Sequence, residues 1–360
     1  MKYVIKEGNT FRNFYPFTIN HATFEIRSGA YSILDRIINK HNLSEDNVIL
    51  LVRDGIKDII SERFPEMSVN PKKMPEFIKE INMESYWDSD EGGDPHSENP
   101  KDYYLWDIIC DNRSLFLDKS NFSMKIDGVI NQSCTTINKE EISISKSAQI
   151  SAGVILDASD GPIIIDEEVF VDIGALIKGP TYIGKKSTVN PGARLLGNVS
   201  IGPCCKVGGE IEHTIFHGYS NKQHDGYLGH SYIGEWVNLG ANTNNSDLKN
   251  NYSDIKFKIG TKIINTGKMF LGCMVGDYTK TGISTMINTG TYIGLGANVF
   301  GGGFQDKFIP SFSWGKNDKI DLDKFLSTLE IVKDRRGQTI SSNEINLITE
   351  LYNSNKSKKF

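Results

Sequence analysis

A repeat of six residues constrains the fold of this chain more than any other feature. Aliphatic residues recur at this spacing without exception at Ile165, Val171, Ile177, Ile183, Val189, Leu195, Ile201 and Val207. A period of six fits neither an α-helix, with about 3.6 residues per turn, nor a plain strand, whose side chains alternate with a period of about two. It is typical of short parallel strands stacked around a coil, with one inward aliphatic residue on each side. The repeat therefore predicts a parallel β-helix.

A second series has the same spacing in another phase. Its members are Phe257, Ile263, Met269, Val275, Thr281, Ile287, Ile293 and Val299, and Tyr227, Ile233 and Leu239 share their phase. Twenty residues separate Val207 from Tyr227, so the phase slips by two between them. Asn245 and Asn251 break the apolar rule farther on. Because a packed coil has little internal cavity, we expect its sites at these irregularities, on its outer faces and between chains.

Composition narrows the function classes. Of 34 glycines, 26 lie between Gly153 and Gly303, where we expect many of them to turn the corners of the coil. The formal charge is −5, which gives no reason to expect nucleic-acid binding. No apolar run approaches the ~18 residues of a membrane span, and the N-terminus shows no signal-peptide core. The five cysteines form no CxxC motif, so we expect reduced thiols in a cytoplasmic protein.

The chain divides into three expected parts. Residues 1–135 read as a reduced α/β domain, with a strand over 47–52, helical stretches over 28–40 and 56–64, a mobile loop over 88–102 and a connecting helix over 103–117. Residues 136–305 form the β-helix, and 306–360 contain an aromatic segment over 309–315 and helices over 322–336 and 343–352. The expected fold class is mostly β.

Four histidines lie near the phase slip: His213, His217, His224 and His230. Their spacing offers one close pair, His213 and His217, and no cysteine or carboxylate cluster accompanies them, so we predict no metal site. We expect His213, His217 and His230 to be polar side chains on a solvated coil.

The surroundings of His224 resemble a known enzyme family. His224 is followed after two residues by Tyr227-Leu228-Gly229, then by a hexad and Val237-Asn238-Leu239-Gly240-Ala241-Asn242-Thr243. Over about 165–305 the chain resembles the acetyltransferase half of the bifunctional glucosamine-1-phosphate acetyltransferase / N-acetylglucosamine-1-phosphate uridyltransferase family. It is similar above all to short alternative bacterial members described as sugar nucleotidyltransferases. The expected coil is thus a left-handed parallel β-helix of hexapeptide repeats.

The resemblance implies a role for each matching residue. His224 would take the proton from an amine that attacks the acetyl thioester, and a neutral imidazole suits this task near pH 7. The expected substrate-binding residues are Tyr227, Asn238, Asp247, Lys249 and Lys256. Acetyl-CoA would lie between subunits of a homotrimer, in a groove with Cys273, Thr289 and Asn298 and with its phosphates near Arg335 and Arg336. Alternatively, these two arginines only balance the C-terminus of a helix.

Three departures from the family pattern leave the acceptor open. Asn190 stands where the family has an arginine, Gly208 where it has a sugar-phosphate lysine, and Asp247 where it has an asparagine. The loss of two cations weakens the case for glucosamine 1-phosphate itself. A different amino sugar and a non-catalytic role both remain possible readings of the sequence.

The N-terminal part resembles the other half of that family only in segments around Arg12 and Arg27, which are the candidate nucleotide contacts. The glycine-rich phosphate loop that should precede Arg12 is absent, because only Glu7-Gly8-Asn9-Thr10 stands there. A domain of about 135 residues is also short for a complete nucleotidyltransferase. We therefore expect this half to be inactive, and Mg²⁺ to be needed only if it is active.

The function expected from the sequence is acetyl-CoA-dependent N-acetylation of an amino-sugar phosphate resembling glucosamine 1-phosphate, in nucleotide-sugar or cell-envelope precursor synthesis. The alternatives are a sugar-1-phosphate nucleotidyltransferase and a non-catalytic scaffold or binding protein.

Overall fold

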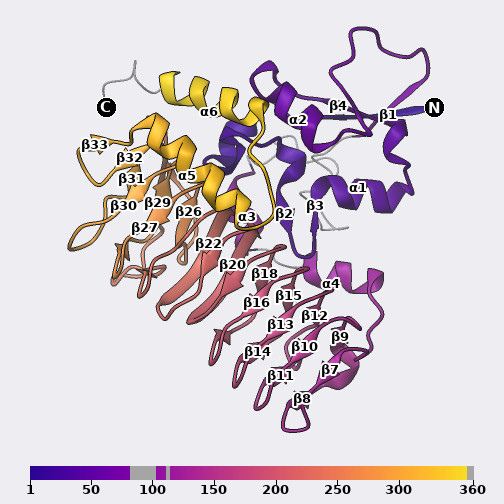
Figure 1. Cartoon of the computed structure of the whole chain (residues 1–360), viewed down its shortest axis with the longest axis vertical. Coiled ribbons are helices and arrows are strands. Elements are labelled where there is room, and N and C mark those ends of the chain that lie inside the picture. The colour runs from indigo at the N-terminus through magenta and orange to yellow at the C-terminus, as the bar shows by residue number, and fades with distance from the viewer. Residues whose placement is uncertain (82–102, 111–113, 355–360) are drawn as a thin grey trace.

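The computed structural model describes residues 1–81, 103–110 and 114–354. Its centre is a coil of parallel β-strands, flanked by an α/β domain and by two C-terminal helices (Figure 1). This arrangement confirms the predicted mostly-β fold. The loop expected over 88–102 lies outside the described residues.

The coil has three faces, each built from short parallel strands of successive turns. The first face contains β7 (Val129–Ile130), β10 (Gln149–Ile150), β13 (Phe170–Val171), β16 (Thr188–Val189), β19 (Lys206–Val207), β21 (Asn221–Lys222), β27 (Lys280–Thr281), β30 (Asn298–Val299) and β32 (Ser313–Trp314). The second contains β8 (Thr135–Ile137), β11 (Ile155–Asp157), β14 (Leu176–Lys178), β17 (Arg194–Leu195), β23 (Asn244–Asn245) and β28 (Met286–Ile287). The third contains β9 (Ile142–Ile144), β12 (Ile163–Ile165), β15 (Thr181–Ile183), β18 (Val199–Ile201), β26 (Cys273–Val275), β29 (Thr291–Ile293) and β31 (Phe308–Ile309). β20 (Glu210–Gly218) and β22 (Tyr227–Glu235) run from the second face around a corner into the third.

The six-residue repeat does place its aliphatic side chains inside the coil. All eight members of the first series are buried in one core, and Val275, Ile287, Ile293 and Val299 of the second series join them. The inward residue of β22 on the second face is Leu228 rather than Tyr227, which was expected there. Burial of this continuous apolar column is the main stabilising term of the coil.

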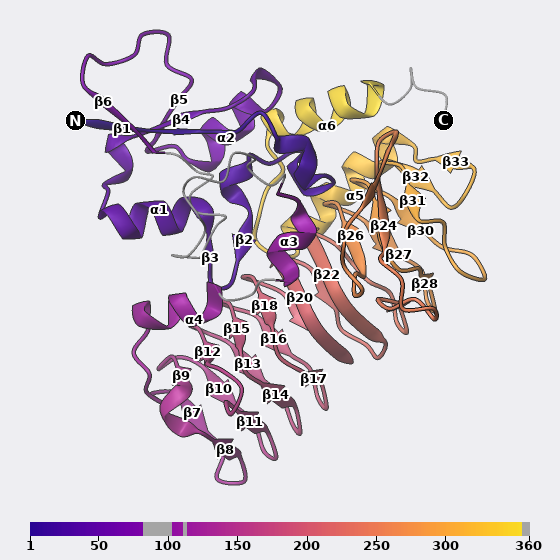
Figure 2. The same ribbon diagram turned by 180° about the vertical axis from the view of Figure 1, so that it is seen from behind.

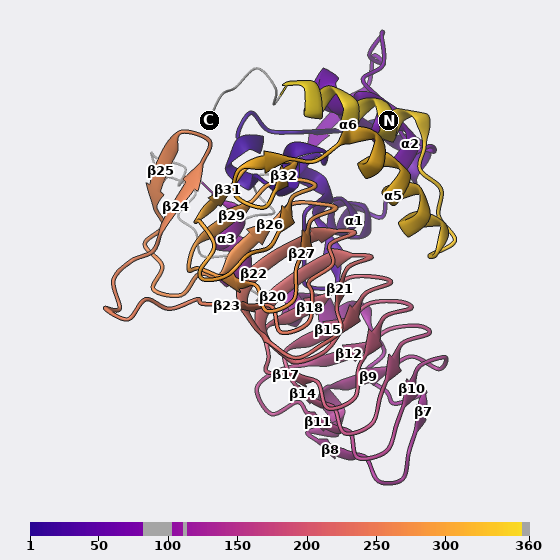
Figure 3. The same cartoon turned by 60° about the vertical axis from the view of Figure 1, so that its left-hand side comes forward.

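The first three members of the second series were predicted wrongly. Phe257, Ile263 and Met269 belong to an insertion that leaves the coil after Asp247 and returns at Leu271. The insertion carries the antiparallel hairpin of β24 (Lys256–Ile259) and β25 (Lys262–Asn265), which projects from the coil in Figure 3. Ile263 is 69% exposed there. Phe257 is buried, but against the α/β domain rather than inside the coil.

The phase slip has a simple structural cause. The spacing between successive inward residues is six elsewhere in the first series. It falls to four residues from Val207 to Ile211 and to five from Ile211 to Phe216. The corner after β19 is made by Gly208 and Gly209 alone, which shortens this turn.

The α/β domain packs on the third face of the coil. Its parallel sheet has the order β5-β4-β1-β6, with β5 (Ser68–Val69), β4 (Val48–Leu51), β1 (Lys2–Lys6) and β6 (Ile78–Ile81), and β2 (Arg27–Ser28) pairs with β3 (Tyr31–Ser32). Its helices are α1 (Ile33–His41), α2 (Lys57–Arg63), α3 (Leu105–Cys110) and α4 (Ser114–Asp118). Figure 2 shows α3 between this domain and the coil, where it contacts β20 and β22. Phe17 and Trp106 share one apolar cluster with Tyr232 and Met274 of the coil, which joins the two parts.

The C-terminal helices cover the corner between the third and first faces. α5 (Leu322–Asp334) and α6 (Ser342–Ser354) follow β33 (Asp318–Lys319), close to the predicted ranges. Phe325 of α5 packs against Tyr278 and Phe312, which both lie at this corner. The coil itself extends past the expected boundaries of 136 and 305 at both ends, because β7 precedes the first and β31 follows the second. Within the described ranges, no helix has the length and apolarity needed to cross a membrane.

Candidate active site on the coil

His224 lies in the loop between β21 and β22, at the corner between the first and second faces. This loop is bonded to the turns on both sides of it. Glu210 N donates to Gly226 O at 3.1 Å, and Asn242 N donates to Asp225 O at 2.9 Å. The His224 side chain is exposed and makes no hydrogen bond to any other described residue. A fixed main chain therefore presents an imidazole that is open to a substrate.

Tyr227 and Asp247, two of the residues predicted to bind substrate, are in contact on the second face. The Tyr227 hydroxyl donates to Asp247 Oδ2 at 2.6 Å and also contacts Glu212 Oε1. Burial and the two carboxylates raise the pKa of Tyr227 well above its ordinary value, so the phenol keeps its proton. Burial would raise the pKa of Asp247, but hydrogen bonds from His230 and Tyr227 lower it, so Asp247 is a carboxylate.

His230 and His213 were expected to be solvated, and this prediction was wrong. His230 Nδ1 lies 2.8 Å from Asp247 Oδ2, and its ring stacks on His213 with centroids 4.4 Å apart. His213 Nε2 lies 2.8 Å from Asn198 Nδ2, and Phe270 stacks on the other side of His230 at 5.2 Å. Burial and the neighbouring His230 lower the pKa of His213. The two histidines occupy equivalent corner positions of β20 and β22, whose register places Glu212 opposite Gly229. The stacking of the two histidines follows from this register, which was not predicted from the sequence.

His217 is also buried rather than solvated. Its ring packs on Phe17 and near His21 of the α/β domain, and its Nδ1 lies 3.3 Å from the Tyr232 hydroxyl. Burial and the nearby His21 hold the pKa of His217 well below its usual value, so it is neutral at pH 7. This histidine belongs to the contact between the two domains.

The other expected substrate residues lie on three different parts of the structure. Asn238 is exposed on the first face, where its Oδ1 accepts from Asn221 Nδ2 at 3.4 Å. Lys249 donates to Asp254 O and to Ser253 Oγ inside its own loop. Lys256 is exposed on the projecting hairpin.

The expected cofactor residues lie in different environments. Cys273 lies wholly inside the coil, where burial raises the pKa of its thiol to about 12, so its expected place in a surface groove is corrected. Thr289 is buried, and its Oγ1 accepts from Lys307 Nζ at 3.2 Å. Asn298 is part-exposed on the first face.

The two arginines near the end of α5 differ from each other. Arg335 is exposed. Arg336 is fixed to the coil, because its guanidinium donates to Cys204 O at 2.6 Å and to Asn221 Oδ1 at 2.7 Å. The Asn221 side chain, on the first face, therefore bonds to both Arg336 and Asn238 and links the two.

The candidate nucleotide residues are not gathered in a phosphate site. Arg12 is exposed beside the Phe11 ring. Arg27 joins the α/β domain to the coil, since its main-chain N donates to the Tyr232 hydroxyl at 3.1 Å and its Nε to His217 O at 3.2 Å.

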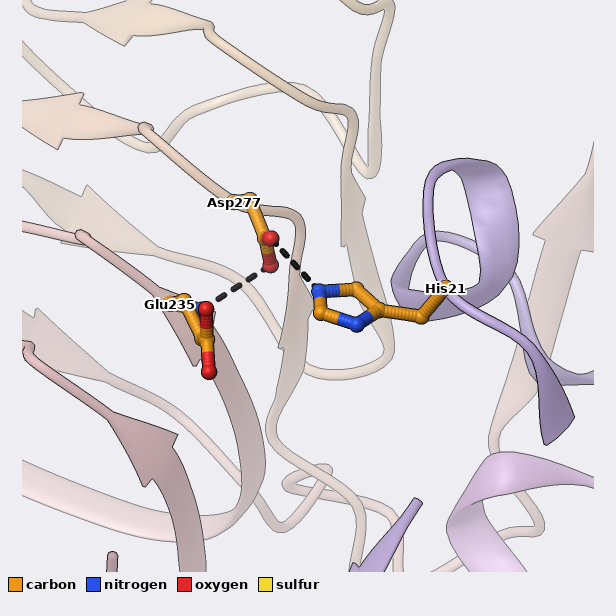
Figure 4. Close-up of side chains that lie close together, drawn as sticks. All are labelled: His21, Glu235 and Asp277. Carbon is orange, nitrogen blue, oxygen red and sulfur yellow. Dashed lines mark hydrogen bonds and ion pairs between the residues drawn. The ribbon is translucent and has the colours of Figure 1, made fainter. Parts of the chain in front are cut away.

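Two groups of side chains have donor atoms close enough to surround a cation. One is Glu212, His230 and Asp247, and the other is His21, Glu235 and Asp277 (Figure 4). In the second group His21 Nε2 already lies 2.8 Å from Asp277 Oδ2, and Arg63 lies 2.9 Å from His21 Nδ1. His21 Nδ1 also lies 3.2 Å from Glu25 Oε1. The Arg63 guanidinium disfavours a second cation there, so we interpret this group as an ionic contact between the domains.

Comparison with known proteins gives this site a context. No protein-family model matches the chain. It is 33% identical over 144 residues to the bifunctional sugar-1-phosphate nucleotidylyltransferase/acetyltransferase of Sulfurisphaera tokodaii, covering 39% of this chain and 36% of the relative. It is 28% identical over 272 residues to the bifunctional protein GlmU of Methanocaldococcus jannaschii, covering 75% and 54%. The chain is therefore similar to GlmU-type proteins over part of their length. It spans about a third to a half of the length of the GlmU-type relatives it matches.

The chain is also similar to the uncharacterized acetyltransferase YaiX of Escherichia coli O6:K15:H31, with 25% identity over 154 residues, or 41% of this chain and 65% of that protein. Among solved structures, the polySia-specific acetyltransferase NeuO matches with a TM-score of 0.28 and 16% identity, covering 53% of this chain and 87% of NeuO. UDP-N-acetylglucosamine acyltransferase from Campylobacter jejuni matches with a TM-score of 0.22 and 13% identity, covering 61% and 82%. Scores this low say nothing about function.

Proposed function

We propose that this protein is an acetyl-CoA-dependent N-acetyltransferase that acts on an amino-sugar phosphate, with His224 as the general base. The observation that carries the proposal is the exposed His224 imidazole on a loop bonded to both neighbouring turns. Two of the matched relatives support it, because their names include an acetyltransferase. The four described free cysteines fit the reducing cytoplasm in which we place the protein.

The proposed reaction is a single acyl transfer. The amine nitrogen of the acceptor attacks the thioester carbonyl carbon of acetyl-CoA, and the C–S bond breaks as the new C–N bond forms. His224 takes the proton that the amine loses, and the leaving CoA thiolate takes up a proton, from the His224 imidazolium or from water, to give free CoA. Proton transfer to a placed imidazole contributes typically about 10²–10⁴-fold to rate.

Acceptor binding is assigned to the residues that the family resemblance implies. The Asp247 carboxylate, oriented by Tyr227 and His230, is a fixed acceptor for a sugar hydroxyl. Asn238 would bind from the first face. Lys249 and Lys256, on the insertion, would supply positive charge for the phosphate.

Acetyl-CoA is proposed to bind between subunits of a homotrimer, with Asn298 along its groove and Arg335 and Arg336 near its phosphates. Exposed apolar side chains at the C-terminal end of the first and second faces support association of this part of the coil: Ile283, Met286, Phe300, Phe304 and Trp314. Ile283, at the corner between these faces, is 80% exposed. Such patches on soluble proteins commonly mark interfaces.

The test is acetyl transfer by His224→Ala, followed as release of CoA thiol with amino sugars offered with and without a phosphate. We expect a fall in kcat of about 10²–10⁴-fold. His41→Ala, at the end of α1, is the control and should keep its activity. A fall of less than about tenfold in His224→Ala would count against general-base catalysis.

A further inference from the structure

A lysine lies inside the coil, and its ammonium contacts the main chain of His224. Lys222 occupies the inward position of β21, opposite Val207 of β19, and its side chain is 1% exposed. Lysines are almost never fully buried unless they are paired. The Lys222 ammonium has no described carboxylate at hydrogen-bonding distance, but donates to two main-chain carbonyls, Gly208 O at 3.2 Å and His224 O at 2.9 Å.

The shortened corner makes room for this ammonium. Gly209 has a φ of +71°, and a Cβ there would lie 2.8 Å from Lys222 Nζ and 2.9 Å from His224 O. A Cβ on Gly208 would lie 2.3 Å from Gln223 O. The two glycines that cause the phase slip thus let the Lys222 ammonium and the His224 loop approach each other closely.

Every carbonyl of the loop 223–226 has its own donor. Gln223 O accepts from Asn190 Nδ2 at 2.9 Å and His224 O from Lys222 Nζ at 2.9 Å. Asp225 O and Gly226 O accept from main-chain amides of the adjacent turns. Only two of these four donors are side chains, and Lys222 is the one that reaches His224 itself.

We propose that Lys222 is a positioning residue for His224, which fixes the main chain of the base from inside the coil and never touches the substrate. This proposal rests on the proposed function, because the contact of Lys222 with His224 matters for catalysis only if His224 is the general base. The His224 side chain has no partner of its own among the described residues, so its direction depends on its main chain. Loss of the Lys222 contact should therefore misdirect the imidazole while the outer surface stays the same.

A pH dependence follows from the same contact. Burial lowers the pKa of Lys222 to about 8, with Asp225 opposing this effect and Arg194 adding to it. Asp225 lies on the same loop and Arg194 on β17, and these are the charged groups that face the ammonium. Above about pH 8 the ammonium loses its charge, so its hold on the His224 carbonyl weakens.

The experiment compares the wild-type protein with Lys222→Met, which keeps an unbranched side chain as far as Cε and removes the ammonium. We expect kcat for acetyl transfer to fall at least tenfold with little change in KM, and the decline of kcat above about pH 8 to disappear. Ser187→Ala is the matched control, because Ser187 is a buried coil residue that donates to Gly202 O away from His224. It should change stability without changing kcat.

Hydrogen–deuterium exchange of the loop 223–226 gives a second readout that does not need activity. Lys222→Met should speed this exchange, and Asn190→Ala should do the same from outside if the core variant fails to fold. Unchanged kcat and unchanged loop exchange in a folded Lys222→Met would overturn the proposal. An inactive wild-type protein would instead refute the proposed function, and loop exchange would then decide whether Lys222 positions the loop.

Discussion

His21 Nε2 lies 2.8 Å from Asp277 Oδ2, and this buried contact joins the α/β domain to the coil. Arg63 and Glu25 complete the group, with Arg63 Nη1 2.9 Å from Glu25 Oε1. Burial and Arg63 would lower the pKa of His21, but Asp277 and Glu25 outweigh them and raise it to about 9. Burial opposes ionisation of Glu25, yet Arg63 and His21 lower the pKa of this carboxyl to about 2.

Stability should therefore depend on pH through His21. A histidine whose pKa is raised in the folded state contributes fully below its unfolded value of 6.5 and loses that contribution as the pH rises to about 9. The contribution is roughly 3 kcal/mol of unfolding free energy. Thermal unfolding across this range checks it, and His21→Gln should lose the alkaline decline. An equal decline in both proteins would contradict this role. Glu25 acts in the opposite direction, with a contribution present above pH 4.5 and lost as the pH falls to about 2.

Asp277→Asn removes the carboxylate from the same contact. It leaves His21 and Arg63 buried with less negative charge, and breaking a buried pair costs about 3–5 kcal/mol. Chemical denaturation should show this loss. The control is Lys185→Ala, which breaks an exposed ion pair with Glu167 and should cost less than about 1 kcal/mol. Equal costs for the two variants would mean that the buried contact adds nothing to domain docking.

Tyr227→Phe tests acceptor binding. The change removes the hydroxyl that orients Asp247, so we expect KM for the amino sugar to rise severalfold while KM for acetyl-CoA stays constant. Its cost in stability should be about 1–3 kcal/mol, because two carboxylates lose their shared donor. Tyr252→Phe, on the exposed insertion, is the control. If both variants have the wild-type KM for the acceptor, Tyr227 is no part of its site.

The sequence predicted the coil because each inward position depends only on local spacing. The inward residues from Ile165 to Val207 could be assigned one by one, because an apolar side chain every six residues is buried when it points into the coil. The same rule failed at Phe257, Ile263 and Met269, where an antiparallel hairpin happens to continue the count. Spacing alone does not tell a strand of the coil from a strand of an insertion.

The site was harder to predict because its contacts cross between turns. Lys222 below His224 and the stack of His213 on His230 depend on how far the coil shortens at Gly208 and Gly209. A shift of one residue in register would turn these side chains to another face. The sequence located the phase slip at 208–226, but it could not show how many residues each corner of the coil uses there.

Ligand-induced stabilisation separates the two activities in the name of the Sulfurisphaera tokodaii relative. A ligand that binds only the folded state raises its stability by about 2.7 kcal/mol at one hundred times its Kd. We expect acetyl-CoA to raise the Tm of the full chain. A nucleoside triphosphate with Mg²⁺ should leave it unchanged, because Arg27 is bonded to the coil and Arg12 lies apart from it, exposed beside the Phe11 ring. If a nucleoside triphosphate raises the Tm of the wild-type protein but not that of Arg12→Ala, the α/β domain binds a nucleotide at Arg12. The nucleotidyltransferase alternative would then be favoured for this domain.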